Sequence, residues 1–298
     1  KFIFDRSFRS TYGGHYGVTR SLLIGLTNLD HGFNYNPPAH LLNKTCLVLS
    51  GIDTLRYAID QKKMGNIELL VAGPNVITVP SEADSLIASE EVDVCLVPSM
   101  WVKELYETIS PELKDRLAIW QAGVDANYWC PSVSFQEINR DKYEYLLYIK
   151  GVEGERLAKQ YIGLFDRIGA TFKVVIYGKY SLAHYKALLS KSTLMIVLGG
   201  TESQGLAFAE AWAMNVPTLI YFVDSWKSPD GNNYRAEAAP YLSSQTGAYF
   251  RGTPDLTDLL ENIRSNKLKY SPREWVLRHM TDEVCAKLLL DKIQQIKG

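Results

Sequence analysis

The sequence has few cysteines, and none of them belongs to a recognisable metal or disulfide motif. Cys46, Cys95, Cys130 and Cys285 stand far apart, with no C-x-x-C pair and no histidine beside them at ligand spacing. No apolar run approaches the ~20 residues of a membrane-spanning helix. The start of the chain also lacks the charged and apolar regions of a signal peptide. We therefore expect reduced thiols and a cytoplasmic location, with membrane association not indicated.

An excess of charge of either sign is also missing. The chain carries 32 Lys and Arg against 33 Asp and Glu, so its net charge of −1 provides no overall attraction for nucleic acid. With 46% apolar and 22% charged residues, the composition excludes disorder and coiled coil as the main architecture. The 298 residues predict two domains of ordinary size. The first residue is Lys1 rather than Met, which suggests one domain or unit of a larger polypeptide.

Short apolar runs bounded by Gly, Pro or Asp alternate with amphipathic stretches along the whole chain. This alternation is typical of parallel sheets covered by helices, so the fold class is predicted to be α/β. In the first half we expect strands at 2–5, 46–50, 67–72, 76–79, 92–97 and 117–121, and helices at 18–29, 53–62 and 101–109. In the second half we expect strands at 145–149, 172–177, 194–198 and 218–222, and helices at 155–168, 182–190 and 206–214.

A break in this alternation predicts the domain boundary. Residues 130–134 contain proline and serine, and the charged stretch 137–142 is typical of an exposed connector. We place an N-terminal Rossmann-like domain at 1–133 and a C-terminal one at 134–278. Ligands of such sheets bind at the carboxyl ends of the strands, so the cleft between the domains is the default site. The polar segment 224–233 is predicted to be a mobile loop.

The segment 199–218 carries the most chemical information. A buried strand leads into a Gly-containing loop and then into a helix, and Gly205 at the start of that helix lets a phosphate approach its N–H groups. Glu202 and Glu210 are eight residues apart, about 80° around an ideal helix and ~12 Å along it. Two carboxylates at this spacing can flank one elongated ligand and accept hydrogen bonds from sugar diols. Glu210 lies among apolar residues, which indicates burial with a partner.

Glu202-x7-Glu210, followed by Ala-Met-Asn-Val-Pro at 213–217, resembles the E-x7-E motif of retaining GT-B glycosyltransferases of the group 1, family 4-like type. Shorter matches lie in the same order along almost the whole chain, at Gly13-Gly14, 97–99, 123–125 and Tyr177-Gly178. No Asp-x-Asp pair occurs in the sequence, which argues against a metal-dependent GT-A transferase.

The resemblance implies two Rossmann-like domains that face each other across a cleft. The first would bind a glycan or glycoconjugate acceptor, and the second a UDP- or GDP-linked nucleotide-sugar donor. The terminal segment 279–298 would cross back as a helix and complete the first domain. The implied activity is transfer of a sugar to a hydroxyl group with retention of configuration, without a metal or another cofactor.

The resemblance also implies roles for individual residues. The catalytic residues would be Glu202, Lys150 and Arg156. The two cationic side chains, Lys150 and Arg156, would contact the donor diphosphate. The acceptor would meet Gly13, Gly14, His15 and Tyr16. The donor would meet Glu210, Gly205, Leu206, Gln204, Ser203, Gly178 and Lys179.

Two alternatives remain at the level of the sequence. An inverting GT-B transferase or a sugar epimerase would share the architecture but needs an acid or base in the first domain, where Asp5 and His15 are the candidates. The stretch between Gly178 and Leu194 is too short for the usual base-binding wall, so a non-catalytic nucleotide-sugar or glycan-binding module also fits. Measurement of turnover separates these alternatives.

Overall fold

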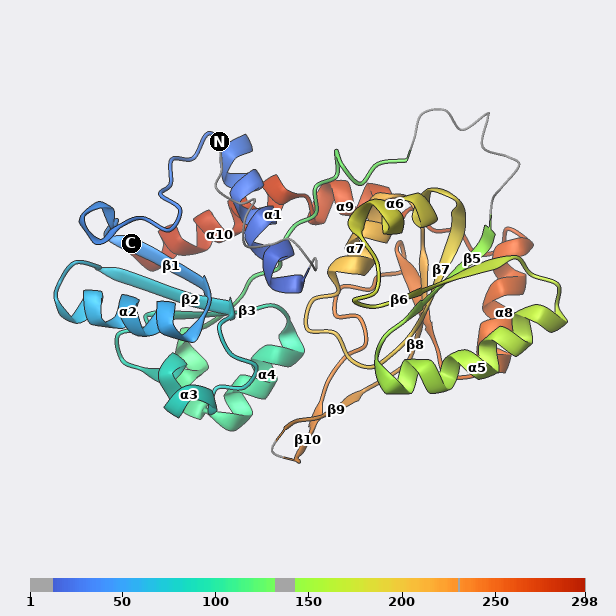
Figure 1. Ribbon diagram of the computed structural model, residues 1–298, viewed down its shortest axis with the longest axis horizontal. Helices are drawn as coiled ribbons and strands as arrows, with labels where there is room; N and C mark the ends of the chain where they lie inside the picture. The colour runs from blue at the N-terminus through green and yellow to red at the C-terminus, as the bar shows by residue number, and fades with distance from the viewer. Residues whose placement is uncertain (1–12, 132–142, 230, 298) are drawn as a thin grey trace. The chain divides into compact units, whose positions relative to one another are not determined.

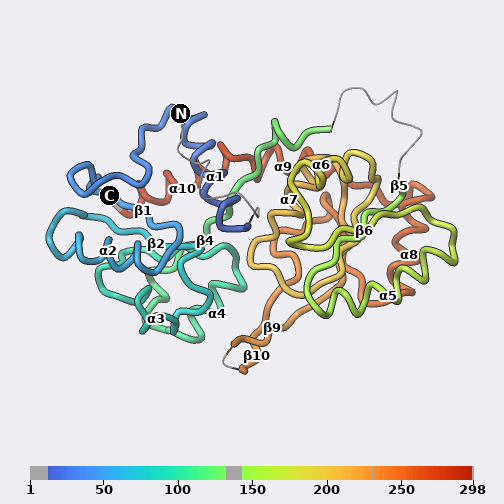
Figure 2. The backbone as a smooth tube through the Cα atoms, in the orientation of Figure 1, coloured from blue at the N-terminus to red at the C-terminus, as the bar shows by residue number. Residues whose placement is uncertain are grey.

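The computed structural model describes residues 13–131, 143–229 and 231–297, which form two compact units (Figures 1 and 2). The first unit contains Val18–Gly123 together with Asp282–Gly298, and the second contains Val124–Thr281 with the described residues 13–17. The predicted domain boundary at 133/134 lies outside the described residues. Each unit is built on its own sheet and is described separately.

The sheet of the first unit consists of four parallel strands in the order β1-β2-β3-β4. Figure 1 shows α2, α3 and α4 on one face of this sheet, and α1 and α10 on the other. The strands are β1 (Thr45–Ser50), β2 (Leu69–Asn75), β3 (Val94–Val97) and β4 (Leu117–Ile119). The helices are α1 (Gly14–Asn28), α2 (Ile52–Lys63), α3 (Glu82–Ser85), α4 (Met100–Ile109) and α10 (Asp282–Lys297), with short turns η1 (Ala39–Leu41), η2 (Leu86–Ala88) and η3 (Pro111–Arg116).

The last helix packs inside the first unit although the sequence places it at the opposite end of the chain. A β-carbon on Gly25 of α1 would lie 2.2 Å from the carbonyl oxygen of Asp282, so only glycine permits this approach of α1 to α10. The indole nitrogen of Trp120 donates a hydrogen bond to the carbonyl oxygen of Cys285 at 2.9 Å. Both Trp120 and Cys285 are buried, so α10 supplies part of the core of this unit.

The sheet of the second unit consists of five parallel strands in the order β11-β8-β7-β5-β6. Alternate residues of β5, which lies between β7 and β6, face α5 and α8, and the residues between them are buried as well, as is usual for a parallel strand covered on both faces. The strands are β5 (Tyr143–Ile149), β6 (Phe172–Ile176), β7 (Ser192–Leu198), β8 (Thr218–Tyr221) and β11 (Gly247–Phe250). The helices are α5 (Gly151–Arg167), α6 (Leu182–Ser190), α7 (Leu206–Ala213), α8 (Thr253–Arg264) and α9 (Pro272–His279).

The predicted α/β class and its parallel sheets are confirmed, but two local predictions are wrong. Residues 76–79 form bends rather than a strand, because Val76 and Val79 are buried as part of a loop that follows β2. The segment 224–233, predicted to be a mobile loop, contains β9 (Ser225–Lys227) and the start of β10 (Asn233–Arg235), which pair antiparallel as a hairpin. The predicted strand at 2–5 lies outside the described residues.

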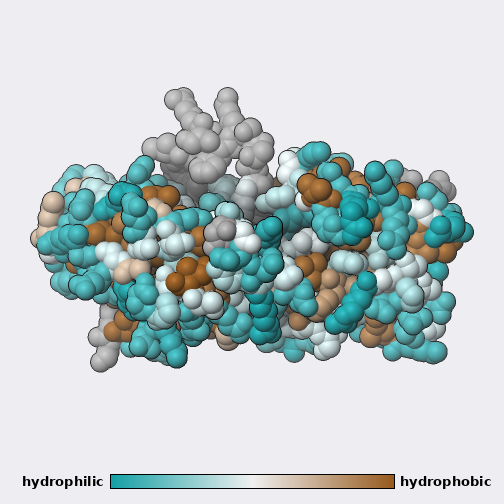
Figure 3. All heavy atoms as spheres, turned by 90° about the horizontal axis from the view of Figure 1, so that it is seen from below, coloured by the Kyte–Doolittle hydropathy of each residue, from teal (hydrophilic) through white to brown (hydrophobic). Residues whose placement is uncertain are grey.

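Figure 3 shows one face, on which hydrophilic residues predominate and apolar ones form separate patches. Among the residues that the structure describes, no helix is both long enough and apolar enough to cross a membrane.

Candidate active site

The structure brings together Lys150 and Glu202, two of the predicted catalytic residues. They follow β5 and β7, which are neighbours in the sheet and end at the same edge, with Ile149 opposite Leu198. The amide of Lys150 donates to the carbonyl oxygen of Leu198 at 2.9 Å. The ammonium nitrogen of Lys150 lies 2.6 Å from Oε1 of Glu202, and these side chains are only 28% and 15% exposed. The sheet edge therefore holds a largely shielded ion pair.

An aromatic ring completes the surroundings of this ammonium group. Tyr177 follows β6, the strand on the other side of β5, and the Nζ atom of Lys150 lies 4.8 Å from the centre of its ring. Such a contact is a cation–π interaction. Lys150 therefore lies between a carboxylate and an aromatic face. From the sequence, Tyr177 was matched only as a motif position, although its place directly after a strand indicated that it would lie at a sheet edge.

The start of α7 is shaped by the glycine that precedes it. Gly205 precedes the helix with φ +78°, and a β-carbon on it would lie 2.8 Å from the Phe208 ring, so glycine is favoured for two reasons. The helix begins at Leu206, and its first N–H groups lack partners within the helix. In the loop before it, Gln204 is buried and Ser203 is exposed.

Glu210 lies two turns into α7 and is only 3% exposed, so the predicted burial is confirmed. A cluster of three tyrosines, Tyr148, Tyr180 and Tyr185, lies near the carboxylates of Glu202 and Glu210. Their rings pack at centroid distances of 5.0 to 6.3 Å. Burial raises the pKa of each, and the negative charge of Glu210 raises the pKa of Tyr180 and Tyr185 further. For Tyr148, burial and the neighbouring tyrosines raise the pKa, and Glu202 adds to this.

This tyrosine cluster was not found from the sequence as part of a site. Its hydroxyl groups stay protonated because their pKa values are raised, and the hydroxyls of Tyr148 and Tyr180 lie 3.4 Å apart. These tyrosines therefore add no further negative charge beside Glu202 and Glu210.

Arg156, predicted to be catalytic, and the predicted donor residues Gly178 and Lys179 are exposed. Arg156 is 69% exposed and donates from Nε to Oε2 of Glu153 on the same helix at 2.9 Å. It therefore has its own ion pair on α5 rather than a place in the Lys150–Glu202 pair. Gly178 and Lys179 form an exposed turn after β6, in which Gly178 has φ +76°.

The predicted acceptor residues lie at the start of α1. The amide of Gly17 donates to the carbonyl oxygen of Gly13 at 3.1 Å, which closes the first helical turn over Gly14, His15 and Tyr16. His15 is exposed and Tyr16 is half-buried. Their role as acceptor residues stays a prediction. Within residues 13–131, 143–229 and 231–297, no three His, Cys, Asp or Glu side chains are grouped so that they could hold a metal ion.

Comparison with known proteins identifies the fold. No family model and no curated protein sequence matches the chain. Among solved structures, the lipopolysaccharide outer core galactosyltransferase WaaB matches at 14% identity and a TM-score of 0.54, over 86% of this chain and 76% of WaaB. Anabaena Alr3699/HepE in complex with UDP matches at 9% identity and a TM-score of 0.56, over 82% of this chain and 76% of HepE. TarM matches at 11% identity and a TM-score of 0.56, over 85% of this chain and 56% of TarM. The chain thus has the α/β fold of GT-B glycosyltransferases.

Proposed function

We propose that this protein is a glycosyltransferase that moves a sugar from a UDP- or GDP-linked donor to a hydroxyl group of a glycan or glycoconjugate, with retention of configuration. The observation that carries the proposal is the shielded Lys150–Glu202 ion pair. Lys150 and Glu202 come after the ends of β5 and β7, two strands of the same sheet. The chain after β7 leads into α7, which begins after Gly205. The likeness in fold to HepE, whose structure contains UDP, supports UDP as the first donor to test.

The proposed chemistry uses these residues at the bond that breaks. As the bond from sugar to diphosphate is cleaved, negative charge develops on the leaving phosphate. The ammonium group of Lys150 and the N–H groups at the start of α7 would stabilise this charge, which is commonly worth several kcal/mol. Glu202, now held by Lys150, would accept hydrogen bonds from the transferred sugar, and Glu210 would accept them from the ribose. Arg156 would take part only if its ion pair with Glu153 broke and the guanidinium group paired with the diphosphate instead.

The proposed reaction needs no metal ion, because cationic side chains and a helix terminus would meet the diphosphate. Titration calorimetry with UDP and GDP, with and without EDTA, tests this directly. We expect binding that EDTA leaves unchanged. A requirement for Mg²⁺ or Mn²⁺ would contradict the proposed donor site.

Turnover is tested by incubating the protein with a panel of UDP- and GDP-sugars and acceptor glycans while nucleotide release is followed. Magnetic resonance of the product then gives the anomeric configuration. Retention supports the proposal, and inversion would replace it by the inverting alternative. Tight nucleotide binding without any release would favour the non-catalytic module.

A further inference from the structure

The β9–β10 hairpin is joined to the candidate active site through the backbone of Glu202. The amide of Glu202 donates a hydrogen bond at 2.9 Å to the carbonyl oxygen of Glu237, which follows the end of β10. The other end of the hairpin follows β8 in the chain, and β8 runs parallel to β7, the strand that precedes Glu202. Because parallel strands end at the same edge of a sheet, both ends of the hairpin start from the edge that holds the Lys150–Glu202 ion pair.

The hairpin is a closed and projecting arm of the second unit. At its base the amide of Ala236 donates to the carbonyl oxygen of Asp224 at 2.9 Å, and Ala236 is only 2% exposed. At its far end the amide of Ser228 donates to the carbonyl oxygen of Asn232 at 2.9 Å. Figures 1 and 2 show the two strands extending away from the five-stranded sheet and beyond its helices. The base is therefore fixed in the unit, while the strands project from it.

One face of the hairpin carries two aromatic rings. Tyr234 lies directly opposite Trp226 in the antiparallel register, so both side chains point to the same face. Their ring centroids lie 6.5 Å apart, the ring planes differ by 33°, and both residues are half-buried. The two rings thus form one aromatic surface that is partly open to solvent.

The rest of the hairpin is hydrophilic. The opposite face presents four polar side chains, all of them exposed: Ser225, Lys227, Asn233 and Arg235. Gly231 and Asn232 near the tip are exposed as well. A hairpin that enters a lipid bilayer would need apolar residues at its tip, because unpaired polar groups are costly to transfer from water. This composition therefore disfavours a membrane as the partner.

A sugar chain fits the aromatic face. Sugar rings present C–H groups that pack on aromatic rings, while the hydroxyl groups at their edges stay hydrated or bond to polar side chains. Tyr and Trp provide such contact area at a small cost in side-chain entropy, because each has only two rotatable side-chain angles. The half-buried pair of Trp226 and Tyr234 therefore has the chemistry of a sugar-binding surface.

We propose that the aromatic face formed by Trp226 and Tyr234 binds sugar units of a glycan acceptor that lie beyond the unit receiving the transferred sugar. This inference rests on the proposed function and adds an acceptor subsite in the second unit. The Cα atom of Tyr234 lies within ~11 Å of that of Glu237, because three residues extend no more than ~3.6 Å each. Glu237 is itself hydrogen-bonded to Glu202. A longer acceptor should therefore bind more tightly than a monosaccharide.

Titration with oligosaccharides, followed by nuclear magnetic resonance, tests the site in the full chain. The probes are gluco-, manno- and chito-oligosaccharides of one to six units. We expect the longer members of at least one series to shift the indole N–H signal of Trp226 and the amide signal of Tyr234. Trp226→Val should weaken this binding at least ~10-fold, and Trp226→Phe, which keeps a ring, should weaken it less. Asn233→Val places the same residue on the opposite face and should leave binding unchanged.

A separate readout shows whether the hairpin forms in each variant. Lys227 and Asn233 are paired in the register, so interstrand nuclear Overhauser effects between their backbones are expected in the unaltered protein and in the variants. Weak binding in Trp226→Val with these effects retained assigns the loss to the missing ring, and Tyr234→Val repeats the test from the other strand. Unchanged binding in both valine variants would overturn the proposal, as would the absence of any shift at the hairpin with every probe.

This titration separates the aromatic face from the proposed transfer reaction because it needs no turnover. Shifts at the hairpin without nucleotide release from any donor would retain the sugar-binding face and contradict the transferase. Transfer to long acceptors with a KM that Trp226→Val leaves unchanged would retain the transferase and overturn the binding face.

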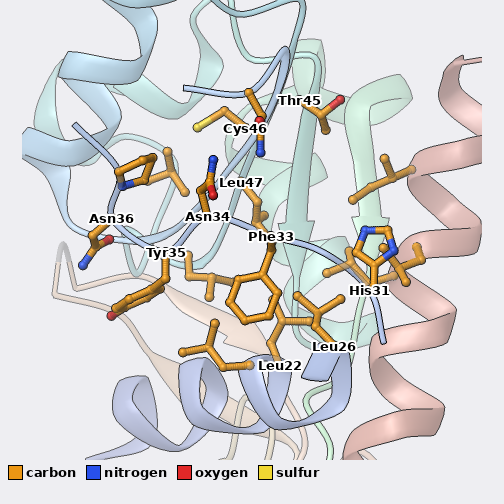
Figure 4. A pocket seen from close by; sticks show the side chains of 18 of the residues that line it. Leu22, Leu26, His31, Phe33, Asn34, Tyr35, Asn36, Thr45, Cys46 and Leu47 are labelled. Carbon is orange, nitrogen blue, oxygen red and sulfur yellow. The ribbon is translucent and has the colours of Figure 1, made fainter. Parts of the chain in front are cut away.

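Two further outcomes would overturn the proposal by assigning the binding elsewhere. Shifts confined to the first unit, where a cavity of about 1180 Å³ borders β1 (Figure 4), would place the glycan there. Shifts at the hairpin with anionic lipid vesicles, but with no oligosaccharide, would make a membrane the partner of this face.

Discussion

The ammonium nitrogen of Lys150 lies 2.6 Å from Oε1 of Glu202, and the two residues follow adjacent parallel strands of one sheet. Both side chains are mostly shielded from solvent, so removal of either leaves the other charge poorly compensated. This pairing gives the candidate site a cation whose position is set by the sheet and by one carboxylate.

Substitution of the ion pair should affect turnover more than nucleotide binding. We expect Lys150→Met to lower kcat ~100-fold or more, because a charge that stabilises the leaving phosphate is lost. Glu202→Gln should lower kcat with nucleotide affinity nearly unchanged, because this residue would contact the sugar. Steady-state kinetics and calorimetry measure both quantities, and Lys159→Met, an exposed lysine of α5, is the control. Equal losses of affinity and turnover in Glu202→Gln would remove Glu202 from the sugar site.

Glu210 should determine nucleotide affinity. Its carboxylate is almost fully buried in α7, and Glu210→Gln keeps its size while removing the charge that would bind the ribose hydroxyls. We expect UDP or GDP affinity to fall at least ~10-fold, about 1.4 kcal/mol. Glu261→Gln, at an exposed position of α8, should leave affinity unchanged. Unchanged binding in Glu210→Gln would contradict the proposed ribose contact.

Substitution of Gly205 by alanine should destabilise the protein, whereas the same substitution at Gly200, in the same loop, should not. At Gly205 a β-carbon meets both a positive φ and the Phe208 ring, whereas at Gly200 it meets nothing within 4 Å. We expect Gly205→Ala to lower the free energy of unfolding of the second unit by ~1–3 kcal/mol. Denaturant titration of both variants measures the difference, and equal stabilities would show that the loop relaxes.

The contact between α1 and α10 should tolerate no added atom. Gly25→Ala places a methyl group against the backbone of Asp282, so we expect the first unit to lose ~1–3 kcal/mol of stability. Gly163→Ala, in the middle of α5 with open space around it, should instead stabilise the second unit by ~0.5–1 kcal/mol. Hydrogen exchange resolves the two units. If the Gly25→Ala variant lost protection from hydrogen exchange only in the second unit, the placement of α10 would be contradicted.

Two of the four thiols should be unreactive in the folded protein. Burial raises the pKa of Cys95 and of Cys285 to about 12, so at pH 8 both remain protonated and lack the nucleophilic thiolate. We expect iodoacetamide at pH 8 to modify the half-buried Cys130 before Cys95 and Cys285, and to reach those two only after addition of urea. Mass spectrometry of peptides identifies the sites. Rapid native labelling of Cys95 would contradict its burial.

Most regular elements were predictable because their signals are local. Apolar runs bounded by turn residues located β1, β3 and β5, and the spacing of apolar residues located α2 and α7. The strand predicted at 76–79 fails for a physical reason: Val76 and Val79 are apolar because they cover a core, and burial of a loop leaves the same pattern as a strand. The hairpin of β9 and β10 is polar because most of it is exposed, so hydrophobicity could not reveal it.

The sequence by itself determined the α/β class, the motif of Glu202 and Glu210, and the burial of Glu210, because each depends on residues that are close together in the chain. Tertiary structure alone decided that Lys150, 52 residues before Glu202, pairs with that carboxylate. It also decided that β1 borders a cavity. These relationships depend on the order of strands in each sheet, and that order is set by the simultaneous burial of many distant apolar side chains.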